Sequence, residues 1–322
     1  MPLRFLQLSS IIDNMIQRPD YVDRLRVAES RPLISVLTGI RRCGKSFILA
    51  LYAEDLLSRG TDPSRLLRIN MESLEFDSLR EYGAMNRFVR ERLPRGGYLL
   101  LDEAQEVEGW ERLAASLAAE GTIRCVLTGS NAALLTSDLG TLLTGRVQEI
   151  PVETLSLAEL TAAKSEEPPE ALFSRYLRIG GFPILHALDY DEESAAAYTS
   201  TLTDVILMRD VVQRHPIRDP DALRRILAFA FDNTGSITSA RKISAYWKSQ
   251  RRAVSTDTTV NYLGDLCDSF RLRKVRRLDI KGKQHLEYSE KYYAGDIGLR
   301  RGLPGRRSGD IAGIVENLVF LE

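Results

Sequence analysis

The sequence predicts an α/β fold, in which a parallel sheet carries helices on both faces and a mostly helical half follows. Two observations lead to this fold class. Between residues 30 and 155, short apolar runs alternate with segments of helical periodicity, as is typical of strands that are buried on both sides. Beyond residue 170 the apolar spacing is mostly helical.

Composition narrows the class of protein further. The chain has 322 residues, enough for about two domains, and its 44% apolar and 27% charged residues are ordinary for a soluble protein. Three scattered cysteines without a C-x-x-C pair, and three histidines, exclude a disulfide framework and a cysteine- or histidine-rich metal site. With no signal peptide and no apolar run near ~20 residues, we expect a cytoplasmic protein outside the membrane.

The elements of the first half can be taken in order. A helical preface covers residues 1–29, and the α/β core is expected over 30–160. Apolar runs that end at glycine or at polar residues predict its strands, and amphipathic spacing predicts its helices. The predicted strands are 33–39, 65–70, 97–105 and 122–130, and the predicted helices are 47–57 and 111–120.

The second half is expected to contain a helical connector over 161–220, with one long helix over 191–214. Three helices and a hairpin around Lys281-Gly282-Lys283 follow within 221–300. This order is the layout of a winged helix. Residues 221–307 hold 19 Lys and Arg against 9 Asp and Glu, a balance of +10 in a chain whose 44 basic and 44 acidic residues cancel overall.

A phosphate-binding loop is predicted between the first strand and its helix, because residues 39–46 read G-x-x-x-x-G-K-S. Its glycines let backbone N–H groups surround phosphate oxygens, and the following helix points its positive end at the same anion. Lys45 would reach the β- and γ-phosphates and Ser46 would coordinate Mg²⁺. Arg41 and Arg42 would touch phosphate or fold outward. The expected nucleotide contacts are Gly39, Arg42, Cys43, Gly44, Lys45, Ser46 and Phe47.

Two carboxylates end the third predicted strand, and they complete the expected site. Asp102 is the predicted Mg²⁺ ligand, and Glu103 is placed to orient and polarise an attacking water. Thr128, Ser130 or Asn131 at the end of the fourth strand could sense the γ-phosphate or simply shape a turn.

Arg146 follows Gly145 near the end of the predicted core. It is either an arginine finger, which would accelerate hydrolysis, or a surface ion-pair residue. As a finger it would act in its own chain or on a neighbouring copy, and the second arrangement would make the protein a homo-oligomer.

Five motifs then occur in one order: LTGIRRCGKS, LLLDEAQEVEGWE, LTGSNAALLTSDLGTLLTGR, YLRIGGFP and KYYAGDIGL. With these five motifs the chain resembles a family of prokaryotic AAA-type P-loop ATPases that carry a C-terminal domain of unknown function. These ATPases are of the AAA+ and signalling type. The resemblance implies an ATPase core, a helical lid and a winged-helix-like domain, and it implies ATP and Mg²⁺ as cofactors. It supports Lys45, Ser46, Asp102 and Glu103 in their roles, and Ser130-Asn131 as the sensor segment.

The resemblance also concerns the later motifs. Gly180-Gly181-Phe182-Pro183 looks like the lid motif whose proline lies near the nucleotide base, although an ordinary tight turn would use the same residues. Members of the family commonly continue into a nuclease-like domain, which is expected to be missing here. The final segment, within 301–322, is apolar enough to be a helix or strand that packs on such a domain.

A basic cluster before and within the predicted hairpin could contact DNA phosphates. Its members in the 271–283 region are Arg271, Arg273, Lys274, Arg276, Arg277, Lys281 and Lys283. The same charges would also suit a solvated face, or a face that docks on the acidic remainder of the chain.

Three functions compete on these residues. The first is a Mg²⁺-dependent ATPase whose turnover rearranges the winged-helix module, with a protein partner that the sequence does not identify. The second is a nucleotide-gated DNA-binding regulator with little turnover. A small-molecule kinase is weaker, because the C-terminal half offers no obvious acceptor pocket. The absence of an N-K-x-D tetrapeptide removes the main argument for guanine.

Overall fold

The computed structural model describes residues 16–31, 33–130, 145–212, 217–250, 254–276, 290–302 and 311–322. The chain divides into two compact units, residues 1–152 and 153–322. The boundary after Val152 lies close to the expected end of the core at residue 160, and the finer division into five segments stays a prediction.

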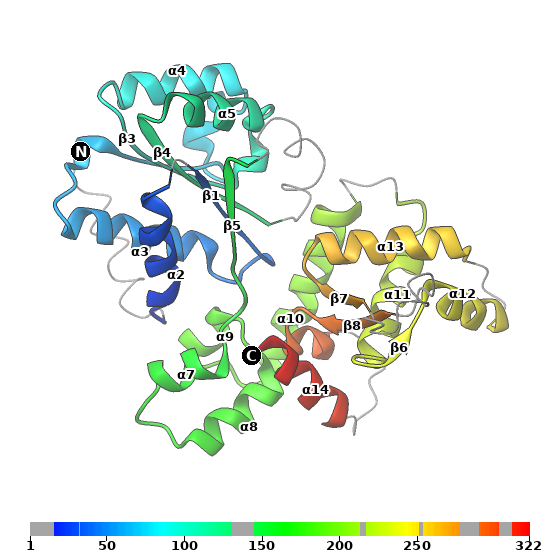
Figure 1. Cartoon of the computed structure of the whole chain (residues 1–322). Coiled ribbons are helices and arrows are strands. Elements are labelled where there is room, and N and C mark those ends of the chain that lie inside the picture. Colours follow the sequence, from blue (N-terminus) through cyan, green and yellow to red (C-terminus); the bar gives the residue numbers. More distant parts are fainter. Residues whose placement is uncertain are drawn as a thin grey trace, which may run out of the picture. The chain divides into compact units, whose positions relative to one another are not determined.

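The first unit contains a five-stranded parallel sheet with the strand order β2-β3-β4-β1-β5 (Figure 1). Because all the strands run the same way, their carboxyl ends meet at one edge of the sheet. Strand β4 lies between β1 and β3, so the segments after these three strands are neighbours at that edge. The strands are β1 (Ile34–Thr38), β2 (Leu66–Asn70), β3 (Gly97–Asp102), β4 (Ile123–Gly129) and β5 (Val147–Pro151).

Helices cover both faces of this sheet, with α2 and α3 on one face and α4 and α5 on the other (Figure 1). Their bounds are α2 (Pro19–Glu29), α3 (Lys45–Ser58), α4 (Tyr82–Arg92) and α5 (Trp110–Glu120). Short 3₁₀ turns occupy Pro63–Arg65, Leu74–Leu79 and Ala104–Glu106. The arrangement confirms the predicted parallel sheet with helices on both faces.

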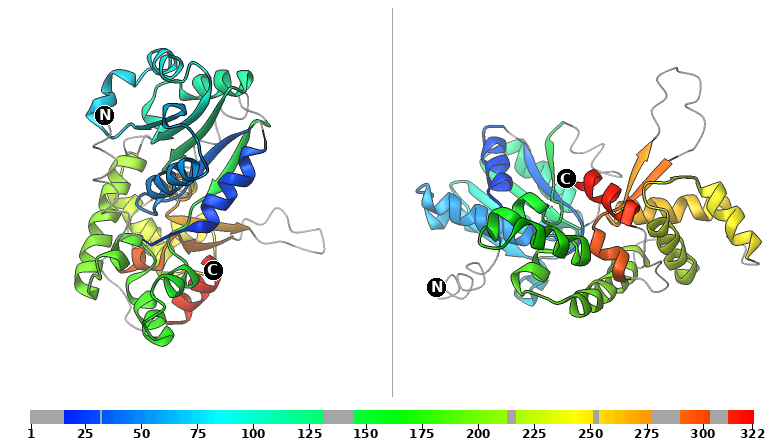
Figure 2. Two further views of the ribbon diagram at one scale, coloured as in Figure 1. Left: turned by 90° about the vertical axis from the view of Figure 1, so that its left-hand side faces the viewer. Right: turned by 90° about the horizontal axis from the view of Figure 1, so that it is seen from below.

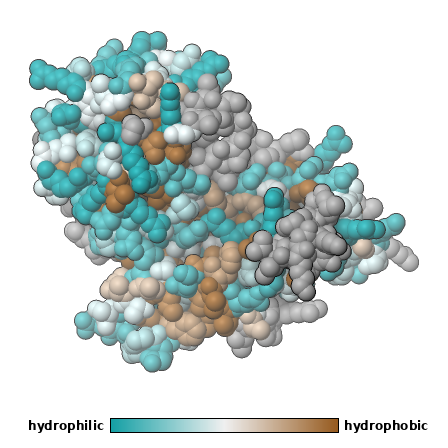
Figure 3. All heavy atoms as spheres, in the orientation of Figure 1, coloured by the Kyte–Doolittle hydropathy of each residue, from teal (hydrophilic) through white to brown (hydrophobic). Residues whose placement is uncertain are grey.

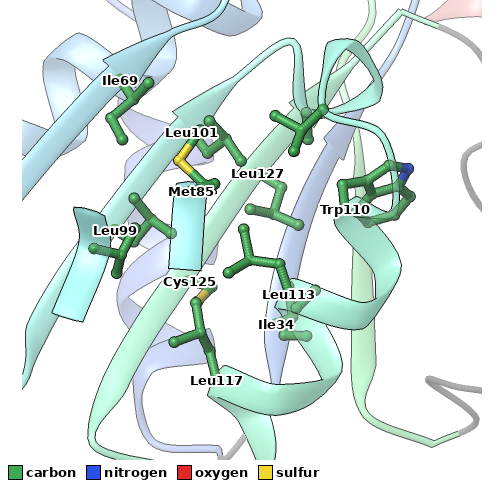
Figure 4. Packing of buried hydrophobic residues seen from close by; sticks show 14 of the residues in the cluster. Ile34, Ile69, Met85, Leu99, Leu101, Trp110, Leu113, Leu117, Cys125 and Leu127 are labelled. Atoms are coloured by element: carbon green, nitrogen blue, oxygen red, sulfur yellow. The ribbon is translucent and has the colours of Figure 1, made fainter. Parts of the chain in front are cut away.

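Packing between the sheet and α4 and α5 forms a closed apolar core (Figure 4). Side chains two residues apart on a strand share a face, so Leu99 and Leu101 point the same way as Cys125 and Leu127 of the neighbouring strand. Leu113 of α5 packs against them (Figure 4). Burying each such leucine contributes about 1.5–3 kcal/mol, so the sheet is a firm base for the loops at its edge.

The second unit begins with helices α7 (Leu157–Ala163), α8 (Pro169–Ile179), α9 (Pro183–Ala187) and α10 (Glu192–Ile206). A π-helix (Leu207–Val212) continues α10. Helices α11 (Pro220–Asp232), α12 (Ala240–Ser249) and α13 (Thr256–Asp268) follow. A three-stranded antiparallel sheet has the order β6-β8-β7, with β6 (Ile237–Thr238), β7 (Leu272–Arg276) and β8 (Glu290–Ala294). A 3₁₀ turn (Ile297–Gly302) and α14 (Ile311–Leu321) end the unit.

Helix α14 docks on strand β8 (Figure 2). Asn317 is fully buried, accepts a hydrogen bond from the Ala294 N–H at 2.7 Å and donates to the Ala294 carbonyl at 3.1 Å. Apolar side chains gather over this helix (Figure 3), where Val319 is 72% and Phe320 40% exposed. The final segment, expected as a helix or strand, is therefore a helix with a partly exposed apolar face.

Several elements differ from the sequence prediction. The four predicted strands are present, but β5 and α4 were not predicted. The long helix predicted over 191–214 is present from Glu192 to Val212, but it changes from α10 to a π-helix after Ile206, and residues 213–214 lie outside the described residues. Strands β7 and β8 pair as the predicted hairpin requires, while its turn lies outside the described residues. Every helix in the described ranges is too short or too polar to cross a bilayer.

Candidate functional site

The segment between β1 and α3 forms a concave backbone loop at the carboxyl edge of the sheet. Gly39, Arg42 and Gly44 have φ values of +150°, +70° and +107°. Left-handed residues in such a turn direct successive N–H groups to one side, which makes an anion-binding concavity. A Cβ at Gly39 would lie 2.1 Å from the Val152 carbonyl oxygen, so close packing also requires this glycine.

Lys45 begins α3 and folds back over this loop. The side chain is only 4% exposed, and Nζ donates to the carbonyl oxygens of Gly39 at 2.8 Å and Ile40 at 3.1 Å. Neutral carbonyls hold an ammonium less strongly than anionic oxygens do. The loop thus keeps a cation beside its own N–H groups, and an anion in the concavity would attract that cation.

Asp102 ends β3 and is 2% exposed. Thr128 Oγ1 of β4 donates to its Oδ1 at 2.5 Å, and the Ser46 hydroxyl at the start of α3 also forms a hydrogen bond with it. Burial raises the pKa of Asp102, while these hydrogen bonds and the charge of Lys45 oppose the rise. The structure therefore brings Lys45, Ser46 and Asp102 together, as the sequence predicted.

Glu103 directly follows the strand in a left-handed conformation, with φ 55° and ψ 54°. Such a conformation costs free energy in a residue with a side chain and is common at functional sites. Its N–H donates to Thr128 Oγ1 at 2.9 Å. Gln105 Nε2 and, at 3.4 Å, Ser130 Oγ both donate to Oε2, so Oε1 accepts no hydrogen bond from a described residue.

Thr128 and Gln105 also contact the two carboxylates, and the sensor role considered for Thr128 stays a prediction. Thr128, considered as a γ-phosphate sensor, is fully buried and joins the Asp102 side chain to the Glu103 backbone. Gln105 was not predicted, although a polar residue two positions after Glu103 was a usable signal. Ser130 is 1% exposed and lies beside Glu103, and Asn131 is outside the described residues.

The other loop residues separate into buried and exposed ones. Cys43 is fully buried, Phe47 is 9% exposed, and Arg42 is exposed. Arg41 is buried and forms an ion pair with Glu72, with 2.6 Å between Nη2 and Oε1. In this structure Arg41 therefore links the loop to the segment after β2.

Arg146 lies at the opposite end of the sheet from the loop. It immediately precedes β5, its carbonyl accepts the Ile34 N–H at 2.8 Å, and Ile34 begins β1 while the loop follows Thr38. Five strand residues separate the two ends by about 16 Å, which an arginine side chain does not span. Action of Arg146 on the site of its own chain is therefore wrong, and action on a neighbouring copy stays a prediction.

Pro183 lies in the second unit, buried at the start of α9. The turn before it is tightly fixed, because the Gly181 N–H donates to Asp296 Oδ2 at 2.8 Å and a Cβ at Gly181 would lie 2.3 Å from the Leu155 carbonyl oxygen. Asp296 also accepts from Thr154 Oγ1 at 2.7 Å. The expected contact of Pro183 with a nucleotide base stays a prediction.

The basic cluster is largely engaged within the second unit. Arg271 is 1% exposed and donates to the Thr203 carbonyl. Arg273 and Lys274 form ion pairs with Glu153 at 2.5 Å and Glu290 at 3.2 Å. Arg276 is exposed, and Arg277, Lys281 and Lys283 lie outside the described residues.

Comparison with known proteins identifies both halves of the chain. An AAA domain matches residues 31–161, and a domain of unknown function (DUF8612) matches residues 170–310. An uncharacterized protein of Haemophilus influenzae is 34% identical over 315 residues, which span 96% of this chain and 78% of that protein. The uncharacterized protein MJ1544 of Methanocaldococcus jannaschii is 26% identical over 355 residues, spanning 100% of this chain and 76% of that protein.

A solved structure shares the fold. The Walker-type ATPase PABY2304 of Pyrococcus abyssi aligns with a TM-score of 0.59 and 17% identity, covering 89% of this chain and 95% of that one. This likeness supports the P-loop ATPase fold. The chain thus belongs to the prokaryotic AAA-type P-loop ATPases that carry a C-terminal domain of unknown function.

Proposed function

We propose that the chain binds ATP with Mg²⁺ and hydrolyses it at the carboxyl edge of the five-stranded sheet. The observation that carries this proposal is the hydrogen-bonded series Ser46, Asp102 and Thr128, with Glu103 next to it and Lys45 in the adjoining loop. These groups come from the starts or ends of three different elements. Membership of a P-loop ATPase family supports ATP as the nucleotide.

Phosphate binding falls to the loop and to Lys45. Gly39 and Gly44 shape the concavity, and its N–H groups are the donors for phosphate oxygens. Lys45 exchanges its two carbonyl acceptors for anionic oxygens, which makes stronger, charge-assisted hydrogen bonds. Arg42, Cys43 and Phe47 line or follow the loop.

Ser46 and Asp102 fit a Mg²⁺ site. A hydroxyl and a carboxylate are hard oxygen donors, and they are already in hydrogen-bond contact. No group of three or more His, Cys, Asp or Glu side chains suited to a metal exists among the described residues, so water and phosphate oxygens would complete the shell. Bound Mg²⁺ would neutralise charge that develops on the phosphates.

Glu103 is the group that orients and polarises the attacking water. Both side-chain donors hold Oε2, which leaves Oε1 available to accept a hydrogen bond from water. Ser130 and Gln105 are therefore positioning residues for Glu103 in this proposal. Thr128 bonds to the Asp102 side chain and to the Glu103 backbone, and so fixes the two residues relative to each other. Metal binding and water activation would therefore occur side by side.

In this proposal the second unit is the part of the chain that changes conformation during turnover. Helices α7–α10 are a candidate lid, and α11–α13 with the β6-β8-β7 sheet are a candidate winged-helix-like module. The order of three helices and antiparallel strands supports this interpretation. Turnover would rearrange this module, and hydrogen exchange with and without Mg–ATP would measure the change.

The alternative, a DNA-binding regulator with little turnover, is less well supported. Arg271, Arg273 and Lys274 make contacts within the second unit, which leaves Arg276 as the exposed basic residue of β7 that has no ion-pair partner among the described residues. Gel shifts with duplex DNA at two salt concentrations would test it, because DNA binding through phosphates weakens steeply with salt.

The proposal is tested by phosphate release from Mg–ATP and by the Lys45→Ala variant. We expect the purified chain to release phosphate and Lys45→Ala to lose nucleotide binding. Lys248→Ala, which removes an exposed lysine of α12, is the control and should behave as the wild type. Absence of both binding and release in the wild type, with and without DNA, would contradict the proposal.

Two further parts of the proposal have separate tests. If Arg146 completes the site of a neighbouring copy, specific activity rises with protein concentration and Arg146→Ala abolishes the rise. If Pro183 lies near the base, Pro183→Ala weakens ATP binding more than it weakens binding of inorganic tripolyphosphate. Flat specific activity or equal weakening would remove these roles.

A further inference from the structure

Arg18 is a fully buried arginine next to the phosphate-binding loop. It directly precedes α2, is 1% exposed, and had no predicted role. Its Nη1 donates to the Cys43 carbonyl oxygen at 3.0 Å, and its Nη2 donates to Tyr21 Oη at 3.4 Å. The guanidinium lies 4.4 Å from the centre of the Tyr21 ring. A residue 25 positions earlier in the chain thus reaches the centre of the loop.

This contact determines how one peptide of the loop is oriented. The Cys43–Gly44 peptide is planar and trans, so its C=O and N–H point in opposite directions. Arg18 holds the carbonyl oxygen, which lies at one edge of that planar peptide. The Gly44 N–H points to the other side and donates to none of the described residues. Fixing the carbonyl therefore keeps one donor of the loop available for an anion.

The charge of Arg18 acts in the same direction. Burying a guanidinium is costly unless hydrogen bonds and an aromatic face stabilise it, as Cys43 and Tyr21 do here. Arginine keeps its charge at any physiological pH. A fixed positive charge behind the loop lowers the free energy of an anion in front of it.

We propose that Arg18 is a positioning residue for phosphate binding, which orients the Cys43–Gly44 peptide so that the Gly44 N–H faces a phosphate oxygen. The inference rests on the proposed function, because it assumes that the loop binds a polyphosphate. It adds the segment before α2 to the binding machinery. Loss of the contact should weaken every ligand that carries the phosphates, whatever base is attached.

The test compares Arg18→Met with Arg24→Met. Arg24 is an exposed residue whose guanidinium lies 5.2 Å from the same Tyr21 ring, and it therefore controls for loss of the aromatic contact. Affinities for Mg–ATP and for Mg–tripolyphosphate are measured by displacement of a fluorescent ATP analogue. Losing a charge-assisted hydrogen bond should weaken both ligands about 10- to 100-fold and by the same factor, with Arg24→Met unchanged.

Kinetics separate positioning from general damage to the fold. We expect KM for ATP to rise at least about tenfold while kcat stays within about threefold, since uniform binding is lost. Arg18→Lys keeps the charge and should recover part of the affinity. If Arg18→Met does not fold, Arg18→Lys decides, with an expected weakening of about three- to tenfold for both ligands.

Each contrary outcome has a distinct meaning. Wild-type affinity in the Arg18 variants overturns the inference and leaves the proposed function intact. Weaker ATP binding with unchanged tripolyphosphate binding places Arg18 at the base and also overturns it. If the wild-type chain binds neither ligand, the proposed function itself fails.

Discussion

Lys45, Asp102 and Glu103 of the first unit come from two separate segments, the start of α3 and the end of β3, whereas Arg271, Arg273 and Lys274 of the second unit lie within residues 271–274, just before and within β7. The first group keeps groups available: the Gly44 N–H and Glu103 Oε1 have no hydrogen-bond partner among the described residues. The second group is engaged with neighbouring carbonyls and carboxylates.

The difference concerns what holds each charge. In the first unit the parallel sheet and the tight turns after its strands fix the positions of polar groups. In an unfolded chain these groups would be hydrogen-bonded to water. In the second unit the charges contribute to the packing of the unit itself. We therefore expect changes in the first group to alter turnover and changes in the second to alter stability.

The largest effect is expected for Glu103→Gln. The amide cannot accept a proton from water, so kcat should fall about 10²- to 10⁴-fold. The affinity for Mg–ATP should stay within about threefold of the wild type, because Glu103 is not proposed to bind the phosphates. Glu108→Gln changes an exposed carboxylate five residues later and is the matched control. Equal activity of Glu103→Gln and Glu108→Gln would contradict the proposed role of Glu103 in turnover.

A pH effect on stability is expected from His186 of the second unit. The ring is 1% exposed, Nε2 contacts the Gly180 carbonyl oxygen at 2.7 Å, and burial lowers the pKa of His186 to about 4. The unfolded chain protonates at about 6.5, so protons favour unfolding below that value. The free energy of unfolding should fall by about 3 kcal/mol between pH 6.5 and pH 4, and then level off.

Urea unfolding of the wild type and of His186→Gln measures this effect. The variant should lose the part of the pH dependence that belongs to His186, while its ATP turnover at neutral pH stays close to that of the wild type. Identical pH profiles would show that another group causes the acid sensitivity. A large loss of turnover would instead connect this turn to the ATPase site.

A smaller effect on stability, with one on turnover, is expected for Thr128→Val. Valine keeps the shape but removes the donor to Asp102 and the acceptor of the Glu103 N–H. Unfolding should become easier by about 1–3 kcal/mol, because two buried groups lose a partner. Phosphate release should also slow. Thr122→Val, at an exposed site just before the same strand, is the control and should change neither the stability nor the rate of phosphate release. If Thr128→Val also changes neither quantity, the proposed role of Thr128 is wrong.

The sequence predicted the parts of the site that depend on spacing and on strand ends. A glycine-rich loop must follow a buried strand, and parallel strands end at one edge, so Lys45, Ser46, Asp102 and Glu103 could be brought together without coordinates. The predicted strands β1, β3 and β4 were readable for a related reason, because runs buried on both faces are continuously apolar. The edge strand β2 is only partly buried and was predicted from its short apolar run alone.

The remaining features depend on contacts between distant residues. The role of Arg18 requires knowing that its side chain points at Cys43, and Thr128 needed the register between β3 and β4. Strand β5 is polar at several positions because it is an edge strand, which hides its periodicity. The run of basic residues in the sequence does not show that Arg271 is buried, because the fold decides which groups surround its side chain.

The smallest effect is expected for the ion pair between Arg273 and Glu153. Both side chains are partly exposed, at 23% and 36%, and such pairs contribute about 0.2–1 kcal/mol. A double-mutant cycle with Arg273→Met and Glu153→Gln should give a coupling free energy in this range, reduced by added salt, and unchanged phosphate release. Coupling well above about 2 kcal/mol, or slower turnover, would mean that the basic strand takes part in the ATPase cycle. The division between a proposed ATP site in the first unit and a strand that stabilises the second unit would then be wrong.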